Sequence, residues 1–506
     1  MSDFHDQTAG YIINPASHPA SGYIGAPQQL PNFATDTGTR KFCSVGLVTT
    51  FIGSVAAFTA AGILYRRQKV IYNDYTNEYD QSPIGFASTA TKEGVSLLLN
   101  FYITACTESL GFVHAASLRW ALYHEGRLKY NSNLRLFTSA RESHANGRVA
   151  NFLWAASLAL SYASVSQFTL PNDPQSAFPH YIFCPSPLVI LGASLLFQGV
   201  LAIWCLVPSK RRRILSWNSS PLNTTLAYCH MNGIRHSDFR VALPSPRQHS
   251  AFKYVPHMQQ ILVFLWSLVP ITALWGVLIW FLAVKDLGQR DTSFSATDDT
   301  GGFYPGTYNL DENSAIAVNT LIVGLMQIVY TLGFHAAEQV VNASRDEEQW
   351  RKAANLDKGV AIGANSVTAA FTSWKTLTLL VLKPIGHWIF GFSCVSFWYG
   401  WLAFHPIPIF CLSGIALLLS VFSTAIVFHQ PTGPQPSTYG NLQFLSIFID
   451  NWGKEDHGRL YWGDKGAVLD LSNQVVRAAG TSETAERLQP IRMQELYSGL
   501  QIGALD

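Results

Sequence analysis

Charged residues are scarce in this chain. Of 506 residues only 13% are Asp, Glu, Lys or Arg, whereas 48% are hydrophobic and 13% are aromatic. The mean hydropathy is +0.14. Soluble domains usually carry about 25% charged residues, so half of the usual charge is missing. The formal net charge is only +2, which gives no basic field that would favour nucleic acid as a partner. The composition indicates a chain embedded in a lipid bilayer.

Cysteine motifs and enzyme signatures are missing as well. Seven cysteines are scattered along the chain without a Cys-x-x-Cys pair, a spacing that favours neither a disulfide framework nor a zinc site. A phosphate-binding loop, a Gly-x-Ser-x-Gly elbow and a His-Glu-x-x-His helix do not occur either. We therefore expect no catalytic residues, no metal and no cofactor, and we regard an enzyme as the least favoured class of protein.

The N-terminal segment lacks the basic start and apolar core of a cleavable signal peptide. It is rich in Gly, Pro, Ser, Ala and Asn, and this composition predicts a disordered tail over residues 1–41. Membrane insertion would then depend on the first internal apolar segment acting as an uncleaved anchor.

Eight apolar stretches are long enough to cross a bilayer, which takes about 20 mostly apolar residues. Only helices and closed barrels satisfy the backbone in lipid, and these stretches have helical length. The predicted fold is therefore an all-α polytopic transmembrane helical bundle over residues 42–428. The predicted spans lie near residues 43–65, 94–118, 149–170, 187–207, 258–284, 314–334, 384–404 and 407–428.

Lys and Arg are concentrated in alternate connectors. Residues 119–148 hold six of them, 209–257 hold eight and 343–375 hold five, whereas 171–186 hold none. Under the positive-inside rule the basic connectors are cytoplasmic, and eight spans then place both termini in the cytoplasm. The connector 66–93 does not fit this topology, because it is predicted to lie outside yet contains four basic residues.

Three short patterns for N-glycosylation conflict with this topology. They lie at Asn218, Asn223 and Asn342, all in connectors predicted to be cytoplasmic. Such patterns recur by chance, so we expect all three to be silent. The basic cluster Lys210–Arg213, just before the first two, is interpreted as a topological anchor that could also attract anionic lipids.

Residues 429–506 are predicted to form a cytoplasmic C-terminal tail after a Pro/Gly-rich break. Leu442, Leu445, Phe448 and Ile449 recur near helical spacing, which predicts a short amphipathic helix. The rest of the tail is too short for a substantial core of its own.

The second predicted span carries a polar stripe. Small and polar residues belong where helices touch each other, so Glu108, the carboxylate of this stripe, is expected to face the bundle interior. A charge in the bilayer core is a candidate functional group. Glu108 would then be a proton or cation site, or alternatively a hydrogen-bonded packing contact. The residues at steps of three or four are Asn100, Thr104, Glu108, Gly111, Ala115 and Arg119.

Two further pairs of polar residues lie near predicted span ends. His335 and Glu338 share one helix face, where they could relay protons or simply reach the aqueous interface. Lys383 and His387 open the predicted span 384–404. Both could meet Glu108 only if the second and seventh spans are neighbours.

Four segments carry a resemblance: "SWNSSPL" (Ser216–Leu222), "GPQPSTYGNLQ" (Gly433–Gln443), "YWGDKG" (Tyr461–Gly466) and "AAGTS" (Ala478–Ser482). In these segments the chain is similar to a group of uncharacterised multi-pass integral membrane proteins of filamentous fungi. The resemblance would cover most of the chain and implies the membrane class and a fungal source. It implies no activity. Ala478 stands where the pattern has histidine.

Three classes of function follow from these features. A non-catalytic scaffold or sensor would act through the cytoplasmic connectors and tail. A transporter or channel would use Glu108 and its stripe, and an interior cavity that reaches Glu108 would favour this class. A membrane-embedded enzyme would need converging carboxylates or histidines, which the sequence scatters. The expected partner is the lipid bilayer, with anionic lipids attracted to Lys210–Arg213.

Overall fold

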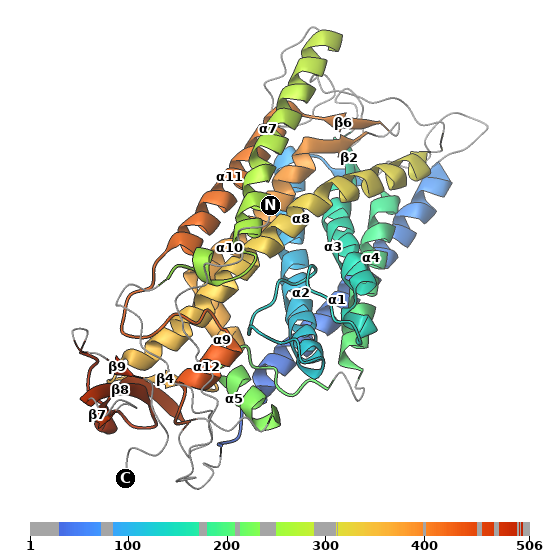
Figure 1. Cartoon of the computed structure of the whole chain (residues 1–506). Coiled ribbons are helices and arrows are strands. Elements are labelled where there is room, and N and C mark those ends of the chain that lie inside the picture. Colours follow the sequence, from blue (N-terminus) through green and yellow to red (C-terminus); the bar gives the residue numbers. More distant parts are fainter. Residues whose placement is uncertain are drawn as a thin grey trace.

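The chain forms a bundle of long helices with a small sheet at one end (Figure 1). The computed structural model describes residues 30–71, 84–171, 180–207, 213–232, 249–287, 310, 312–397, 401–452, 458–469, 475–492, 495 and 497–498. The predicted all-α membrane bundle is confirmed, since seven helices in these ranges are long and apolar enough to cross a bilayer. They are α1 (Thr37–Ile71), α2 (Thr89–His124), α3 (Arg148–Gln167), α4 (Pro185–Leu206), α7 (Met258–Leu287), α8 (Glu312–Arg351) and α11 (Pro406–Phe428).

Helix length separates α8 from the others. Its 40 residues correspond to about 60 Å at 1.5 Å per residue, which is about twice the thickness of the hydrocarbon core. The C-terminal half of α8 therefore extends past the predicted span 314–334 and reaches the connectors at one end of the bundle. Two other helices begin with proline at the first turn, where a missing N–H costs nothing: Pro185 in α4 and Pro406 in α11.

The predicted span 384–404 is wrong in position. Helix α10 runs over Trp374–Ser393, and a hairpin of β5 (Cys394–Ser396) and β6 (Leu402–Phe404) follows it. Helix α10 lies among α2, α3, α8 and α11. Its inner face, which carries Lys383, is buried, whereas Leu377 and Val381 on another face are exposed. Because protein covers the inner face, this face tolerates a polar residue that lipid would not. The two ends of residues 394–404 are therefore strands of a β-hairpin and do not continue the helix.

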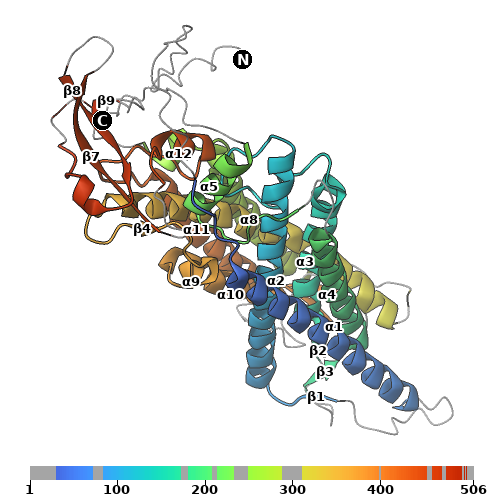
Figure 2. The same ribbon diagram turned by 90° about the horizontal axis from the view of Figure 1, so that it is seen from below.

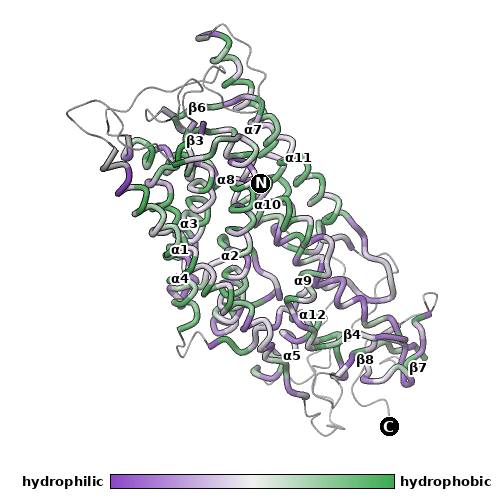
Figure 3. The backbone as a smooth tube through the Cα atoms, turned by 180° about the vertical axis from the view of Figure 1, so that it is seen from behind, coloured by the Kyte–Doolittle hydropathy of each residue, from purple (hydrophilic) through white to green (hydrophobic). Residues whose placement is uncertain are grey.

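The surfaces of α1 and α7 are strongly apolar. Val45 and Ile52 on α1, and Val263 and Leu274 on α7, are exposed, as expected for side chains that face lipid tails. Figure 3 shows the hydrophobic colour along the long helices and more hydrophilic colour at the end that carries α12 and the sheet. The hydropathy pattern thus separates a membrane body from one polar end.

The polar end is built from the shorter helices and a four-stranded sheet (Figures 1 and 2). Strands β4, β7, β8 and β9 lie in that order, antiparallel except for the β8–β9 pair. The elements are α5 (Pro221–Asn232), α6 (Ala251–Tyr254), α9 (Ser366–Phe371), α12 (Leu442–Phe448), β4 (Val360–Ala361), β7 (Arg459–Leu469), β8 (Val475–Ser482) and β9 (Tyr497–Ser498). Single 3-10 turns occupy His144–Asn146, Lys352–Ala354 and Ala485–Arg487. A second sheet, β1 (Gly85–Phe86), β3 (Tyr181–Phe183) and β2 (Thr169–Pro171), lies at the opposite end of the bundle.

The three basic connectors meet at the polar end. The side-chain amide of Asn131 donates to the carbonyl of Ser219 at 2.8 Å and to the carboxylate of Asp346 at 2.9 Å, which joins one residue from each connector. They therefore lie on one side of the bundle, as their charge predicts. That this side is cytoplasmic stays a prediction. Lys210–Arg212 and the acidic connector 288–309 lie outside the described residues.

The predicted disordered tail over residues 1–41 is wrong for its last part. Residues 1–29 lie outside the described residues, but Ala34 donates its amide to Asn223 Oδ1 at 2.7 Å, and the amide of Trp217 donates to the carbonyl of Thr35 at 3.0 Å. Helix α1 then begins at Thr37. These residues are ordered because their backbone is bound by the 213–232 segment.

The "SWNSSPL" and "GPQPSTYGNLQ" segments are packing elements of the polar end. Asn218 and Asn223 are both fully buried in the folded chain. That their glycosylation patterns are silent stays a prediction. The second segment wraps the end of α8, where Glu347 Oε2 accepts from the amides of Thr438 and Tyr439, each at 2.8 Å. The tail has no separate core. It packs on the end of α8 through Trp350, Trp452, Leu460 and Trp462.

A candidate solute-binding cavity

A buried lysine joins three helices inside the bundle. Lys383 on α10 forms ion pairs with Glu108 on α2 and with Glu338 on α8, the second at 3.1 Å. The lysine side chain is 6% exposed, so a neutral environment would penalise its charge strongly. Two carboxylates at this position offset that penalty. The contacts make α2 and α10 neighbours, the condition under which Lys383 was expected to meet Glu108.

Arg135 adds a second cation to this cluster. It lies in the connector between α2 and α3, and its Nη2 is 2.8 Å from His335 Nδ1 and 3.5 Å from Glu338 Oε2. His335 Nδ1 is in turn 2.9 Å from Glu338 Oε2. The guanidinium can only donate. His335 Nδ1 can therefore accept from Arg135 when unprotonated, or donate to Glu338 when protonated, but it cannot do both at once.

A cavity of about 140 Å³ opens beside the cluster. A single water needs about 10–15 Å³ by this measure, so the cavity holds on the order of ten waters. Glu108 and Glu338 keep 23% and 26% of their side-chain surface exposed, whereas Lys383 and Arg135 keep 6% and 7%. The carboxylates are thus more accessible than the cations that neutralise them. The charged residues of the cavity wall are Glu108, Arg119, Arg135, Glu338, Arg345, Asp346 and Lys383.

The far wall of the cavity is formed by the connectors. Asp346 accepts hydrogen bonds from Asn131 Nδ2 and Ser132 Oγ, both at 2.9 Å. Arg119 donates its Nε to the carbonyl of Asn131 at 3.0 Å and its Nη1 to the carbonyl of Asn218 at 2.8 Å. Neutral partners therefore satisfy both charged groups. This part of the wall is rigidly hydrogen-bonded and connects α2, α8 and the "SWNSSPL" segment.

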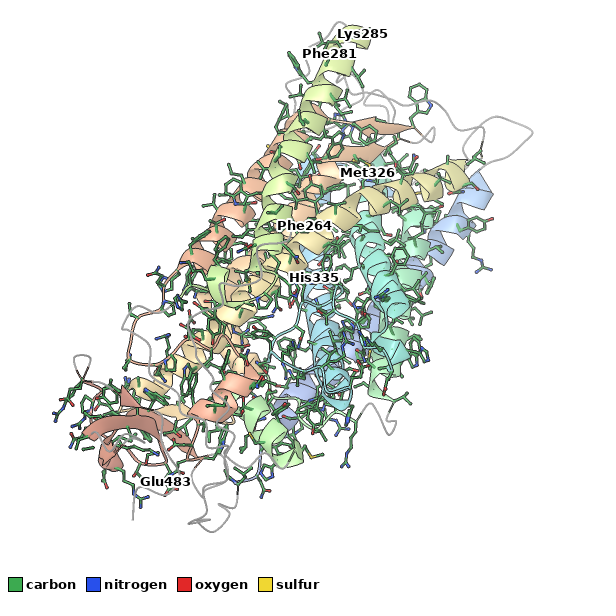
Figure 4. The ribbon with its side chains drawn as sticks, in the orientation of Figure 1. Phe264, Phe281, Lys285, Met326, His335 and Glu483 are labelled. Carbon is green, nitrogen blue, oxygen red and sulfur yellow. The ribbon has the colours of Figure 1, made fainter. Side chains whose placement is uncertain are left out.

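The structure brings five of the sequence-predicted site residues together. Glu108, Arg119, Glu338 and Lys383 line the cavity, and His335 lies directly behind Glu338. Figure 4 places His335 between the two ends of the bundle, which Lys285 and Glu483 mark, and His335 is 7% exposed. His335 is therefore buried within the bundle, whereas Glu338 is partly exposed to the cavity.

Thr104 and His387 lie away from the cavity wall. Thr104 Oγ1 is 2.8 Å from the carbonyl of Asn100 and 2.9 Å from the hydroxyl of Tyr162. The ring of His387 stacks on that of Tyr162 at 3.6 Å with an interplanar angle of 7°. Gln327 Nε2 lies 3.0 Å from His387 Nδ1. These side chains form a second polar group, deeper along α2 and α10.

Sequence reasoning missed Arg135, Arg345 and Asp346. Arg135 and Arg345 were counted only as connector cations. Arg135 folds back from an irregular connector, which leaves no periodic pattern, and Arg345 and Asp346 lie on the part of α8 that extends beyond the predicted span 314–334. One weak signal was available at Gly111. A Cβ on this residue would lie 1.8 Å from Arg135 Nη1, so the glycine is required for the close approach of that side chain.

Among the described residues, no three His, Cys, Asp or Glu side chains are grouped so as to hold a metal ion. Comparisons with known protein families, curated proteins and solved structures found no match to this chain. The geometry of the cavity and its charges is therefore the basis for a functional conclusion.

Proposed function

We propose that this membrane protein is a transporter that binds a small charged solute in the cavity between α2, α8 and α10. The observation that carries the proposal is the bridge from Lys383 to Glu108 and Glu338 at the wall of that cavity. Ion pairs that serve only as helix glue gain nothing from an adjacent cavity, since the cavity lowers packing density and admits water.

A charged solute in the cavity can displace one partner of the ion pairs between Lys383 and the carboxylates of Glu108 and Glu338. A charged group that enters the cavity competes with Lys383 for a carboxylate, or with a carboxylate for Lys383, and so changes the energy of the contacts between α10 and its neighbours. Helix α10 also contains Pro384, next to Lys383. Proline removes one helical hydrogen bond, which eases bending at this point.

Polar side chains continue beyond the cavity toward the other end of the bundle. Thr104, Gln327 and His387 lie on α2, α8 and α10, and Tyr162 lies on the neighbouring α3. All four are buried. Buried polar groups inside a membrane bundle are costly and mark ion or solute pathways. Their position supports the passage of a solute through the bundle, in addition to its binding in the cavity.

Sided chemical labelling tests the proposal without knowledge of the solute. Ala115 lines the cavity, and Cys411 is the exposed cysteine among those described, the other six being buried. In a Cys411→Ala background, Ala115→Cys is treated with a membrane-impermeant methanethiosulfonate reagent in right-side-out and in inside-out vesicles. A transporter whose cavity opens alternately to each side is labelled in both preparations.

The matched control is Ala159→Cys in the same background, because Ala159 is fully buried in α3 and stays unlabelled from either side. Labelling of Ala115→Cys from one side alone would overturn transport and leave the predicted scaffold or sensor as the better description. Absence of labelling from both sides would overturn it as well, because the cavity would then be closed to solutes.

A further inference from the structure

We propose that the occupant of the cavity is an amphipathic anion, with one carboxylate or phosphate headgroup on an apolar chain, that enters from the bilayer. This inference rests on the proposed function and names the class of its solute. It is carried by two independent features of the cavity wall: an excess of positive charge at one part and an aromatic surface at another.

The charges of the wall do not balance. Four cations, Arg119, Arg135, Arg345 and Lys383, face three carboxylates. Among the described residues no carboxylate oxygen lies within 4.0 Å of Arg345, whose one hydrogen bond is a long contact of 3.5 Å from Nη1 to Asn342 Oδ1. A bound group with a single negative charge would make the wall neutral.

Arg345 is suited to hold such a group. A guanidinium has five N–H donors arranged for bidentate contact with a carboxylate or phosphate. The neighbouring Asp346 accepts hydrogen bonds from Asn131 and Ser132, and among the described residues it forms no ion pair with Arg345. Arg345 lines the cavity, so an anionic headgroup bound there could accept from its remaining donors.

The aromatic part of the wall lies between α1, α2 and α9. The ring of Phe42 makes edge contacts with Phe112 at 6.1 Å and with Phe371 at 6.4 Å, and all three residues line the cavity. Phe371 is 50% exposed, and Leu377 and Val381 on the adjacent α10 are also exposed apolar residues. This side of the cavity thus adjoins an exposed apolar surface, which favours the entry of an apolar chain over that of a hydrated ion.

Photo-crosslinking in vesicles tests the class of ligand. The full-length protein is illuminated in the presence of a diazirine-bearing palmitate, and the modified peptides are identified by mass spectrometry. We expect crosslinks on the peptides that carry Phe42, Phe112 and Phe371. Unlabelled palmitate and hexadecyl phosphate, the two headgroup sources, are each added as competitors, and methyl palmitate serves as the neutral control.

Palmitate competition without hexadecyl phosphate competition assigns a carboxylate, and the reverse assigns a phosphate. Equal competition by methyl palmitate would overturn the role of charge. Competition by acetate or inorganic phosphate at the same concentration would overturn the role of the apolar chain. Crosslinks spread over all lipid-facing helices would show only contact with bulk lipid and would overturn the proposal.

A variant series locates the headgroup. Arg345→Gln is expected to reduce the competable crosslinking by about tenfold or more, the usual effect of losing a hydrogen bond to a charged group. Arg345→Lys should restore much of it, and Arg487→Gln, at an exposed arginine of the sheet region, should leave it unchanged. Unchanged crosslinking in Arg345→Gln would overturn the assignment of Arg345.

The two proposals fail separately. If the palmitate probe labels the cavity but Ala115→Cys reacts from one side only, the ligand class stands and transport is overturned. If Ala115→Cys reacts from both sides but no probe labels the cavity, transport stands and the amphipathic anion is overturned.

Discussion

Lys383 shows how one residue determines whether a group of buried charges is stable. It neutralises two carboxylates from different helices. Replacing it by Met leaves Glu108 without a cation, while Glu338 keeps Arg135. Removing one partner of a buried pair costs about 3–5 kcal/mol, and we expect about 2–4 kcal/mol here because both carboxylates retain partial exposure.

Thermal unfolding of the solubilised protein, followed by tryptophan fluorescence, measures this loss. The double variant Lys383→Met/Glu108→Gln should regain much of it, because no unpaired charge remains on α2. Lys352→Met, at an exposed lysine, is the control and should change stability little. A melting temperature for Lys383→Met equal to that of the control would show that the ion pairs contribute no net stability.

Glu125 provides a pH-dependent counterpart outside the membrane-spanning helices. Burial alone would raise its pKa, but hydrogen bonds from the amide of Glu142, the side chain of Arg127 and the amide of Arg141 together hold the pKa below its ordinary value of 4.5. The unfolded chain then binds the proton more readily. Glu125 therefore stabilises the fold fully above pH 4.5, and this contribution is lost as the pH falls through the lower pKa of the folded state.

Glu125→Gln should accordingly lower stability by about 1 kcal/mol at pH 7, the usual net value of such hydrogen bonds, and by progressively less below pH 4.5. Melting temperatures of the two proteins between pH 3 and 7 measure the difference. Glu486→Gln, at an exposed carboxylate, is the control. A difference between the parent and Glu125→Gln that stays constant over this range would contradict the linkage.

At the scale of the element, α2 shows what a helix reveals from sequence alone. Its polar stripe follows from a spacing of three and four residues, which is a local property of the chain, and Glu108, Gly111, Ala115 and Arg119 do line the cavity. The partner Arg135 is not predictable in this way. Its position depends on how a connector of irregular structure folds back against α2, and no period in the sequence encodes that path.

Helix α10 shows the opposite case. Its start at Trp374 was missed because Lys375 and Lys383 lower the hydropathy of its first half, although the face that carries them is buried against other helices. Residues 394–404 were assigned to the span because they are apolar, although their two ends pair as strands, with Cys394 opposite Phe404. Burial by protein and burial by lipid leave different signals, and only the second follows from composition.

A pair of glycine substitutions on α2 tests the close approach between this helix and the connector. Gly111→Ala places a methyl group where Arg135 Nη1 now lies and displaces the guanidinium from His335 and Glu338. We expect a loss of about 1–3 kcal/mol, typical of overpacking. Gly94→Ala on the same helix meets no atom within 4 Å and should gain about 0.5–1 kcal/mol from helix propensity.

Melting temperatures of the two variants should therefore shift in opposite directions. If Gly111→Ala were as stable as Gly94→Ala, Arg135 would have an alternative position of equal energy, and its place in the charged cluster would not be determined by α2.

At the scale of the whole molecule, the segments "SWNSSPL" and "GPQPSTYGNLQ" have a structural role at the polar end. "SWNSSPL" supplies carbonyls to Arg119 and Trp120, and "GPQPSTYGNLQ" supplies amides to Glu347 at the end of α8. These hydrogen bonds join the two segments to the cavity wall and to the end of α8. A sequence shows that such polar motifs are present, but their role becomes apparent only when the distant helices they join are known.

The orientation of the polar end in the membrane can be tested by one substitution. Asp298→Asn changes the triplet at 298–300 from Asp-Asp-Thr to Asn-Asp-Thr, an acceptor for N-glycosylation in the acidic connector predicted to be lumenal. In a eukaryotic host we expect a mobility shift that glycosidase treatment removes, whereas the parent chain should show none, because Asn218, Asn223 and Asn342 lie in connectors predicted to be cytoplasmic. Sugar on the parent chain that Asn342→Gln or Asn218→Gln abolishes would invert the topology and place the cavity's connectors on the lumenal side.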